Sequence, residues 1–151
     1  MRMKFRIAVS KEKYDSVKDY LTDHGVDIGE EAEFQITESA GYPAFLSARN
    51  DKKDRIRLSV ADVIFIEAFG KEIEIHTMQE TFFSTDRMYQ LESMLDPKEF
   101  IRVSKSVIVA RKYVKKIRPS ISMKYILTMS DGTLVDVTRS YYYEFRRFFN
   151  I

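Results

Sequence analysis

The segment spanning residues 100–118 most constrains the fold, because it carries a high positive charge on a frame that favours β-strands. It reads FIRVSKSVIVARKYVKKIR and contains no acidic residue. Valine and isoleucine recur along it, and β-branched side chains favour strands that are tied into a core. We therefore expect the charge to be held in a fixed geometry and not on a disordered tail. The seven basic residues are Arg102, Lys105, Arg111, Lys112, Lys115, Lys116 and Arg118.

Fixed basic side chains with small hydroxyl residues between them suit a phosphate backbone. Lysine and arginine release counterions when they meet phosphates, and hydroxyl groups help to position the backbone. Ser104 and Ser106 are the hydroxyl residues here, and Arg111 and Lys112 are further candidates for backbone contact. A charge run is also often only a solvated strand face. Charge alone leaves both interpretations open.

The charge distribution along the chain points to an anionic partner. The 151 residues have a net charge of +2, yet residues 99–151 hold 11 basic and 4 acidic side chains. This asymmetry does not separate nucleic acid from an acidic protein or a membrane surface. The chain has no cysteine, the N-terminus becomes charged before a signal sequence could form, and no apolar run approaches the roughly 20 residues of a membrane span. We expect a soluble, cytoplasmic protein.

No constellation typical of an enzyme is present, and no cofactor is expected. The histidines His24 and His76 lie in different segments without ligand partners at a metal spacing. Glu72 and Glu74 share one strand face, which is more often an exposed acidic face than an acid–base pair. The five glycines form no phosphate-binding loop, and no small-molecule substrate site is evident.

Residues 1–43 are predicted to form a small βαβ-like unit. KFRIAV reads as a strand, Ser10 offers a helix N-cap, and Gly25 is a plausible stop after a helix of about four turns. A second strand is expected around Phe34 and Ile36. This unit is too short to bury much apolar surface alone, so a role in dimerisation or regulation is expected.

Residues 44–151 are predicted to be mostly antiparallel β-structure. AFLSA and RIRLS suggest a hairpin, and VIFIEA, EIEIHT and TFFS suggest a meander. A short helix is expected between Thr85 and Asp96. The turn Asp131-Gly132 marks a clear hairpin, and the final residues read as a closing helix with Phe145 on its apolar side. At the start of that helix, Arg139 can project from a rigid corner, although an arginine near an N-cap can also simply face solvent.

Three segments in order carry a family resemblance: VADVIFIEAFGKEIEIHT, LESMLDPKEFIRVSKSVIVARKYVKKI and LTMSDGTLVDVTRSYYYEFRRFF. Together they resemble the LytTR DNA-binding domain of bacterial transcription regulators, over roughly residues 44–151. The resemblance implies a mainly β (α+β) fold. It is an elongated arrangement of small, mostly antiparallel sheets with two short helices, which reads DNA through side chains on loops.

The resemblance also implies roles for individual residues. Base-reading positions fall at Lys105, at Arg139 and at the loop containing Glu72 and Ile73. Glu72 and Ile73 are not obvious donors, so Lys71 is expected to contact a phosphate. The other implied backbone contacts are Arg87, Arg102, Ser106 and Ser140.

We expect a sequence-specific DNA-binding transcriptional regulator, related to response regulators, that binds double-stranded DNA as a homodimer. Only some 43 residues precede the resemblance, so a phosphoacceptor receiver domain is not expected. The alternative is a non-enzymatic interaction module whose basic face binds an acidic partner. An RNA-binding function is disfavoured, because no aromatic RNA-binding signature is present.

Overall fold

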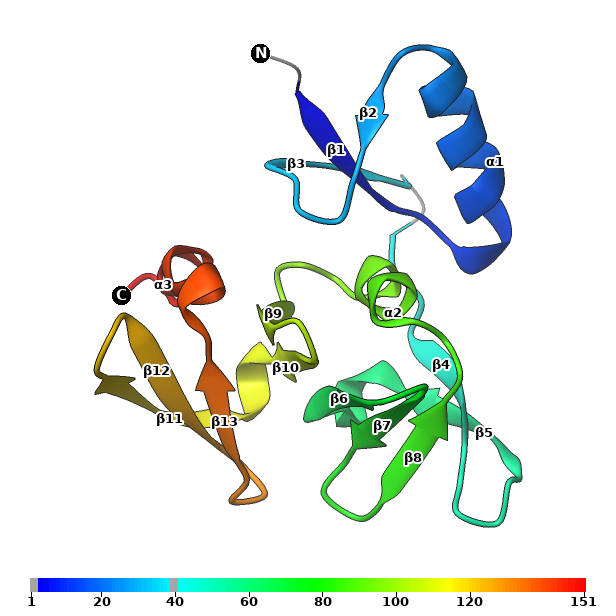
Figure 1. The fold of residues 1–151 in the computed structure, drawn as a ribbon. Helices are drawn as coiled ribbons and strands as arrows, with labels where there is room; N and C mark the ends of the chain where they lie inside the picture. The colour runs from blue at the N-terminus through cyan, green and yellow to red at the C-terminus, as the bar shows by residue number, and fades with distance from the viewer. Residues whose placement is uncertain (1–2, 39–40) are drawn as a thin grey trace. The chain divides into compact units, whose positions relative to one another are not determined.

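The computed structural model describes residues 3–38 and 41–151; residues 1–2 and 39–40, within the predicted N-terminal unit, lie outside the described part. The fold is mainly β, with 41% strand and 25% helix, which confirms the predicted class. Contacts divide the chain into two compact units. Unit 1 contains Met1–Pro43 and Tyr89–Leu95, and unit 2 contains Ala44–Met88 and Asp96–Ile151 (Figure 1).

Unit 1 is built on a three-stranded parallel sheet with the order β2-β1-β3. Its elements are β1 (Lys4–Ala8), α1 (Lys11–Asp23), β2 (Asp27–Ile28) and β3 (Phe34–Thr37). Ser10 occupies the N-cap of α1 as predicted, but its hydroxyl makes no capping hydrogen bond. Its backbone N–H instead donates to the Glu38 carboxylate. Gly25 follows the helix with φ +79°, a left-handed conformation that glycine adopts without strain.

Unit 1 takes its second helix from the middle of the chain. Apart from its first residue, α2 (Met88–Met94) belongs to this unit. Glu92 of α2 forms an ion pair of 2.8 Å with Arg6 of β1, and the Arg6 Nε donates to the Gln35 side chain at 3.1 Å. Because the Arg6 guanidinium contacts both Glu92 of α2 and Gln35 of β3, it anchors α2 to this sheet.

Unit 2 contains a seven-stranded antiparallel sheet with the order β5-β4-β8-β7-β6-β10-β9. The predicted hairpin of β4 and β5 and the predicted meander are both present. Their alternating apolar residues fill one face, because successive strand residues point to opposite faces. The strands are β4 (Phe45–Arg49), β5 (Arg55–Ser59), β6 (Phe65–Phe69), β7 (Glu72–His76), β8 (Thr81–Ser84), β9 (Phe100–Ser104) and β10 (Val107–Ala110).

A second sheet and the closing helix complete unit 2. The strands β11 (Val114–Ser120), β12 (Lys124–Met129) and β13 (Leu134–Val137) form an antiparallel sheet, with the predicted Asp131-Gly132 turn between the last two. Helix α3 (Tyr142–Phe149) places Phe145 in the core at 0% exposure. Buried residues of both sheets surround it, including Val103, Val109 and Leu127. This shared core fixes β9 and β10 relative to β13 and α3.

Candidate nucleic-acid interface

Two tight turns lie side by side at one end of the seven-stranded sheet. Phe69 pairs with Glu72, so Gly70 and Lys71 form a two-residue turn between β6 and β7. Ser104 pairs with Val107, so Lys105 and Ser106 form another between β9 and β10. The Ala68 N–H donates to the Ser106 carbonyl at 2.8 Å, which joins β6, the strand that leads into the first turn, to the second turn.

The corner before α3 lies at the same end of β9. The Thr138 N–H donates to the Val103 carbonyl at 2.9 Å, and the Thr138 hydroxyl is 3.4 Å from the same oxygen. Arg139 and Ser140 follow directly in a short 3-10 helix, Arg139–Tyr141. Three segments that are far apart in the sequence therefore meet. We call Gly70, Lys71, Lys105, Ser106, Arg139 and Ser140 the turn cluster.

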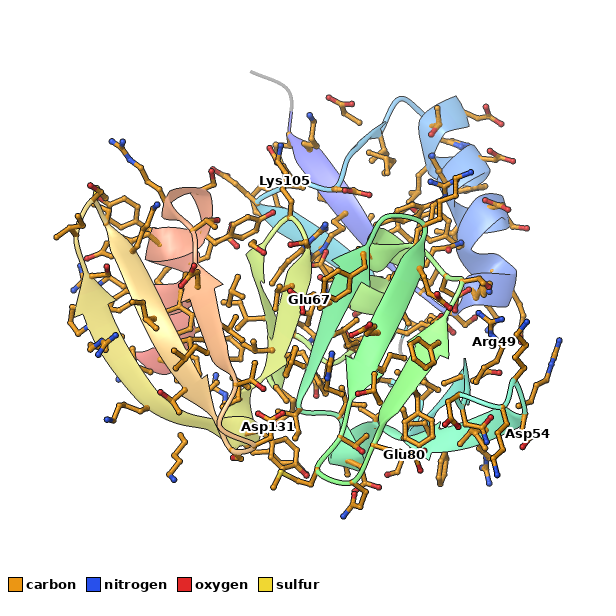
Figure 2. All side chains as sticks on the ribbon, turned by 60° about the horizontal axis from the view of Figure 1, so that its bottom comes forward. Arg49, Asp54, Glu67, Glu80, Lys105 and Asp131 are labelled. Atoms are coloured by element: carbon orange, nitrogen blue, oxygen red, sulfur yellow. The ribbon has the colours of Figure 1, made fainter. Side chains whose placement is uncertain are left out.

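The charged groups of the turn cluster are available to a ligand. Lys71, Lys105 and Arg139 are all exposed. Among the described residues, no hydrogen bond or ion pair holds their ammonium or guanidinium groups. Figure 2 shows Lys105 at the tip of its hairpin, with Glu80 and Asp131 in turns at the opposite end of unit 2. The turns that carry Lys71 and Lys105 therefore lie at one end of unit 2, and those that carry Glu80 and Asp131 lie at the other.

Arg102 lies beside the cluster with its guanidinium engaged. Its Nη2 donates to the Lys105 carbonyl at 2.5 Å, and its Nε donates to the Ser104 carbonyl at 3.3 Å. Within the same turn, the Ser106 N–H donates to the Ser104 hydroxyl at 3.2 Å. Both serines therefore form part of the turn's own hydrogen-bonding network.

The basic segment 100–118 does not form the single surface that its charge run suggests. Lys105 precedes β10 and Lys112 follows it, so these lysines lie beyond opposite ends of a four-residue strand that is itself roughly 13 Å long. Lys112 lies near the acidic turn, since the neighbouring Tyr113 carbonyl accepts a hydrogen bond from the Ser130 N–H at 2.8 Å. We therefore exclude Lys112 from the turn cluster, and its contact with the DNA backbone stays a prediction.

The Arg111 side chain forms hydrogen bonds within the protein. Its Nε donates to the Lys98 carbonyl at 2.9 Å and its Nη2 to the Phe148 carbonyl at 2.8 Å. The guanidinium also stacks on the Phe148 ring, 4.0 Å from its centre. These contacts tie the last turn of α3 to the loop before β9. The predicted phosphate contact at Arg111 has no support in this arrangement.

The base contact predicted at Ile73 stays a prediction, and the position of its side chain gives it no support. Its side chain is 4% exposed and lies on the apolar face of the seven-stranded sheet, among the buried residues. Glu72 is exposed and forms a 3.5 Å ion pair with Arg49, and its predicted role is not tested by this contact. Arg87 is exposed and follows β8, whose last residue Ser84 pairs with Ile73 near the same end of the sheet.

Within residues 3–38 and 41–151, no group of three or more histidine, aspartate or glutamate side chains could hold a metal ion. None of the helices in this described part is long and apolar enough to cross a membrane.

Comparisons with known proteins identify the family of this chain. The model of the LytTr DNA-binding domain family matches residues 53–150. The chain belongs to the LytTR DNA-binding domain family. A solved LytTr DNA-binding domain of a Bacillus cereus response regulator has the same fold, with a TM-score of 0.68 and 24% identity. The match covers 72% of this chain and 99% of that domain.

The LytTR match extends to longer curated relatives. The sensory transduction protein LytT of Bacillus subtilis is 29% identical over 90 residues, which cover 60% of this chain and 37% of LytT. The transcriptional regulatory protein LytR of Staphylococcus aureus is 26% identical over 108 residues, which cover 72% of this chain and 44% of LytR. The matched region therefore spans about two fifths of the length of these relatives.

Proposed function

We propose that this chain is a transcriptional regulator that binds double-stranded DNA sequence-specifically through the turn cluster. In this proposal Lys105 and Arg139 read base edges, because both carry donors suited to guanine. Lys71, Ser106 and Ser140 contact phosphates and set the register on the duplex. One observation carries the proposal. Three segments that are far apart in the sequence meet at one end of unit 2, and their charged groups make no hydrogen bond or ion pair within the described residues.

The proposal extends to assembly and location. A homodimer would match two half-sites on one face of the duplex, and unit 1 is proposed to support that assembly or its regulation. Because the proposed partner is bacterial DNA, the proposed location is the cytoplasm. No catalytic step is assigned to the protein.

Selection from a randomised duplex pool, followed by fluorescence anisotropy titration, tests the proposal. The selected duplex is compared with a scrambled duplex of equal composition at two salt concentrations. We expect the selected duplex to bind at least about 10³-fold more tightly, as is typical of specific recognition. Equal binding of both duplexes would contradict sequence-specific reading and favour a basic face that meets acidic partners without regard to sequence.

A further inference from the structure

Arg102 holds the two carbonyl groups that flank Lys105. The Ser104 carbonyl belongs to the peptide plane before the Lys105 Cα, and the Lys105 carbonyl belongs to the plane after it. The guanidinium donates to both, at 3.3 Å and 2.5 Å. Because each peptide unit is planar, fixing both planes fixes φ and ψ of Lys105 and with them the direction of its Cα–Cβ bond.

We infer that Arg102 is a positioning residue for base reading by Lys105 and not a phosphate contact. The inference rests on the proposed function and deepens it. Lys105 lies in a two-residue turn with an exposed side chain, so the backbone of the turn decides where its ammonium can reach. From the other side, the Ala68 N–H holds the Ser106 carbonyl at 2.8 Å. The turn is thus braced from β9 and from β6.

The chemistry of arginine explains why this residue suits the task. Its planar guanidinium presents several N–H donors in a rigid fork and stays charged at every accessible pH. A lysine at the same position would keep the charge as a compact ammonium on a flexible stem. Arg102→Lys therefore distinguishes a phosphate contact from a positioning role. A phosphate contact mainly needs the positive charge, whereas holding both carbonyls needs the several N–H donors of the guanidinium.

The test is an anisotropy titration of the full chain with a duplex selected by the wild type and with its single-base-pair variants. The base pair read by Lys105 is first identified with Lys105→Ala. We expect Arg102→Lys to reduce the preference at that same base pair by about 5–100-fold. Affinity for a scrambled duplex should stay within about twofold and the salt slope should not change, because the charge is retained. Arg55→Lys, at an exposed arginine of β5, is the matched control and should leave both quantities unchanged.

A double variant provides a second criterion. Lys105→Ala combined with Arg102→Lys should lose no more preference than Lys105→Ala alone, because both changes act on one contact. Two results would overturn the inference in favour of a phosphate contact. One is that Arg102→Lys keeps the full preference at the base pair read by Lys105. The other is that Arg102→Met keeps this preference while its salt slope falls by about 0.9.

Two further outcomes are informative. If Arg102→Lys is unfolded at the assay temperature, the titration is made at a lower temperature with Arg102→Met, which also removes the donors to the Ser104 and Lys105 carbonyls. The same loss at the same base pair would support the inference, and full preference would overturn it. A wild-type chain that does not distinguish selected from scrambled duplex would instead overturn the proposed function, and this inference with it.

Discussion

Lys105 and Arg139 differ from Arg102 and Arg111 in what their charged groups touch. The first two extend from turns into solvent, whereas the other two donate to backbone carbonyls. A cation that already satisfies carbonyls gives up those hydrogen bonds if it turns towards a phosphate. These four basic residues therefore divide into two that face solvent and two that donate to backbone carbonyls, although all four contribute equally to the net charge.

Replacement of Lys105 or Arg139 by alanine should each weaken binding to a selected duplex by about 1–3 kcal/mol and relax the preference at one defined base pair. The reason is the loss of a donor aimed at a base edge. Anisotropy titrations of the selected duplex and its single-base-pair variants measure both effects. Equal losses on selected and scrambled duplexes would assign both residues to the phosphate backbone.

Lys112→Ala is the matched control for Lys105→Ala. Both lysines are exposed, and both belong to the basic segment 100–118. Lys112 follows β10 at the end that carries the acidic turn, so its replacement should leave the base preference unchanged. A salt slope lower by about 0.9 in this variant would support the predicted backbone contact of Lys112.

Arg111→Ala should destabilise the protein by about 1–3 kcal/mol, because two carbonyls lose a charged donor and the stacking on Phe148 is lost. Urea unfolding measures this loss. The salt dependence of binding to DNA should stay the same under conditions where the variant is folded. A salt slope lower by about 0.9 would restore Arg111 as a phosphate contact.

At the scale of secondary-structure elements, local patterns predicted most of the fold. The β4–β5 hairpin, the β6–β7–β8 meander and the β12–β13 hairpin each follow from alternation next to a turn signal. Such pairings join segments that are neighbours in the sequence, so short-range chemistry decides them. The same alternation placed Ile73 with Ile75 on the buried face. It was a signal against the base contact that the family resemblance implied.

Long-range pairings could not be predicted in this way. Strand β4 pairs with β8, and β6 pairs with β10, across long stretches of chain. Helix α2 belongs to unit 1 although its sequence lies between two strands of unit 2. The roles of Arg102 and Arg111 depend on backbone carbonyls that only the folded chain brings to them. Charge and spacing carry no signal for such partners.

The stability of the first turn of α1 should decrease in acid because of Glu38. Hydrogen bonds from the Ser10 N–H and from Lys13, at 3.2 Å, hold the pKa of the Glu38 carboxyl below its usual range. A lowered folded-state pKa stabilises the fold above the unfolded pKa of roughly 4.3, and this stabilisation is lost as the pH falls through the folded-state value. The protection factor of the Lys13 amide, which corrects hydrogen exchange for its intrinsic pH dependence, should therefore fall in acid more in the wild type than in Glu38→Gln.

The control for Glu38→Gln is Glu33→Gln, at an exposed carboxylate of the same unit. This control should keep the wild-type pH dependence. Equal acid sensitivity in the wild type and Glu38→Gln would contradict the assigned role of Glu38.

At the scale of the whole molecule, assembly through unit 1 makes a distinct prediction. Phe34 is 43% exposed on the edge strand β3, and an open edge or apolar patch of this kind is a common pairing surface. If unit 1 supports the homodimer, Phe34→Asp should shift the protein towards monomers in sedimentation velocity. Leu134→Asp is the matched control, because Leu134 is 63% exposed on the edge strand β13 of unit 2. The reverse pattern, with monomers only in Leu134→Asp, would place the dimer contact on unit 2.

The most direct test of the central claim is a map of backbone amide shifts on addition of a selected duplex to the wild-type chain. The claim is that the end of unit 2 carrying the turn cluster meets DNA. We predict the largest changes at residues 70–71, 104–106 and 138–141, because these backbone segments carry Lys71, Lys105 and Arg139. The largest changes at residues 78–80, 112–113 and 130–132, around the acidic turns, would contradict the claim.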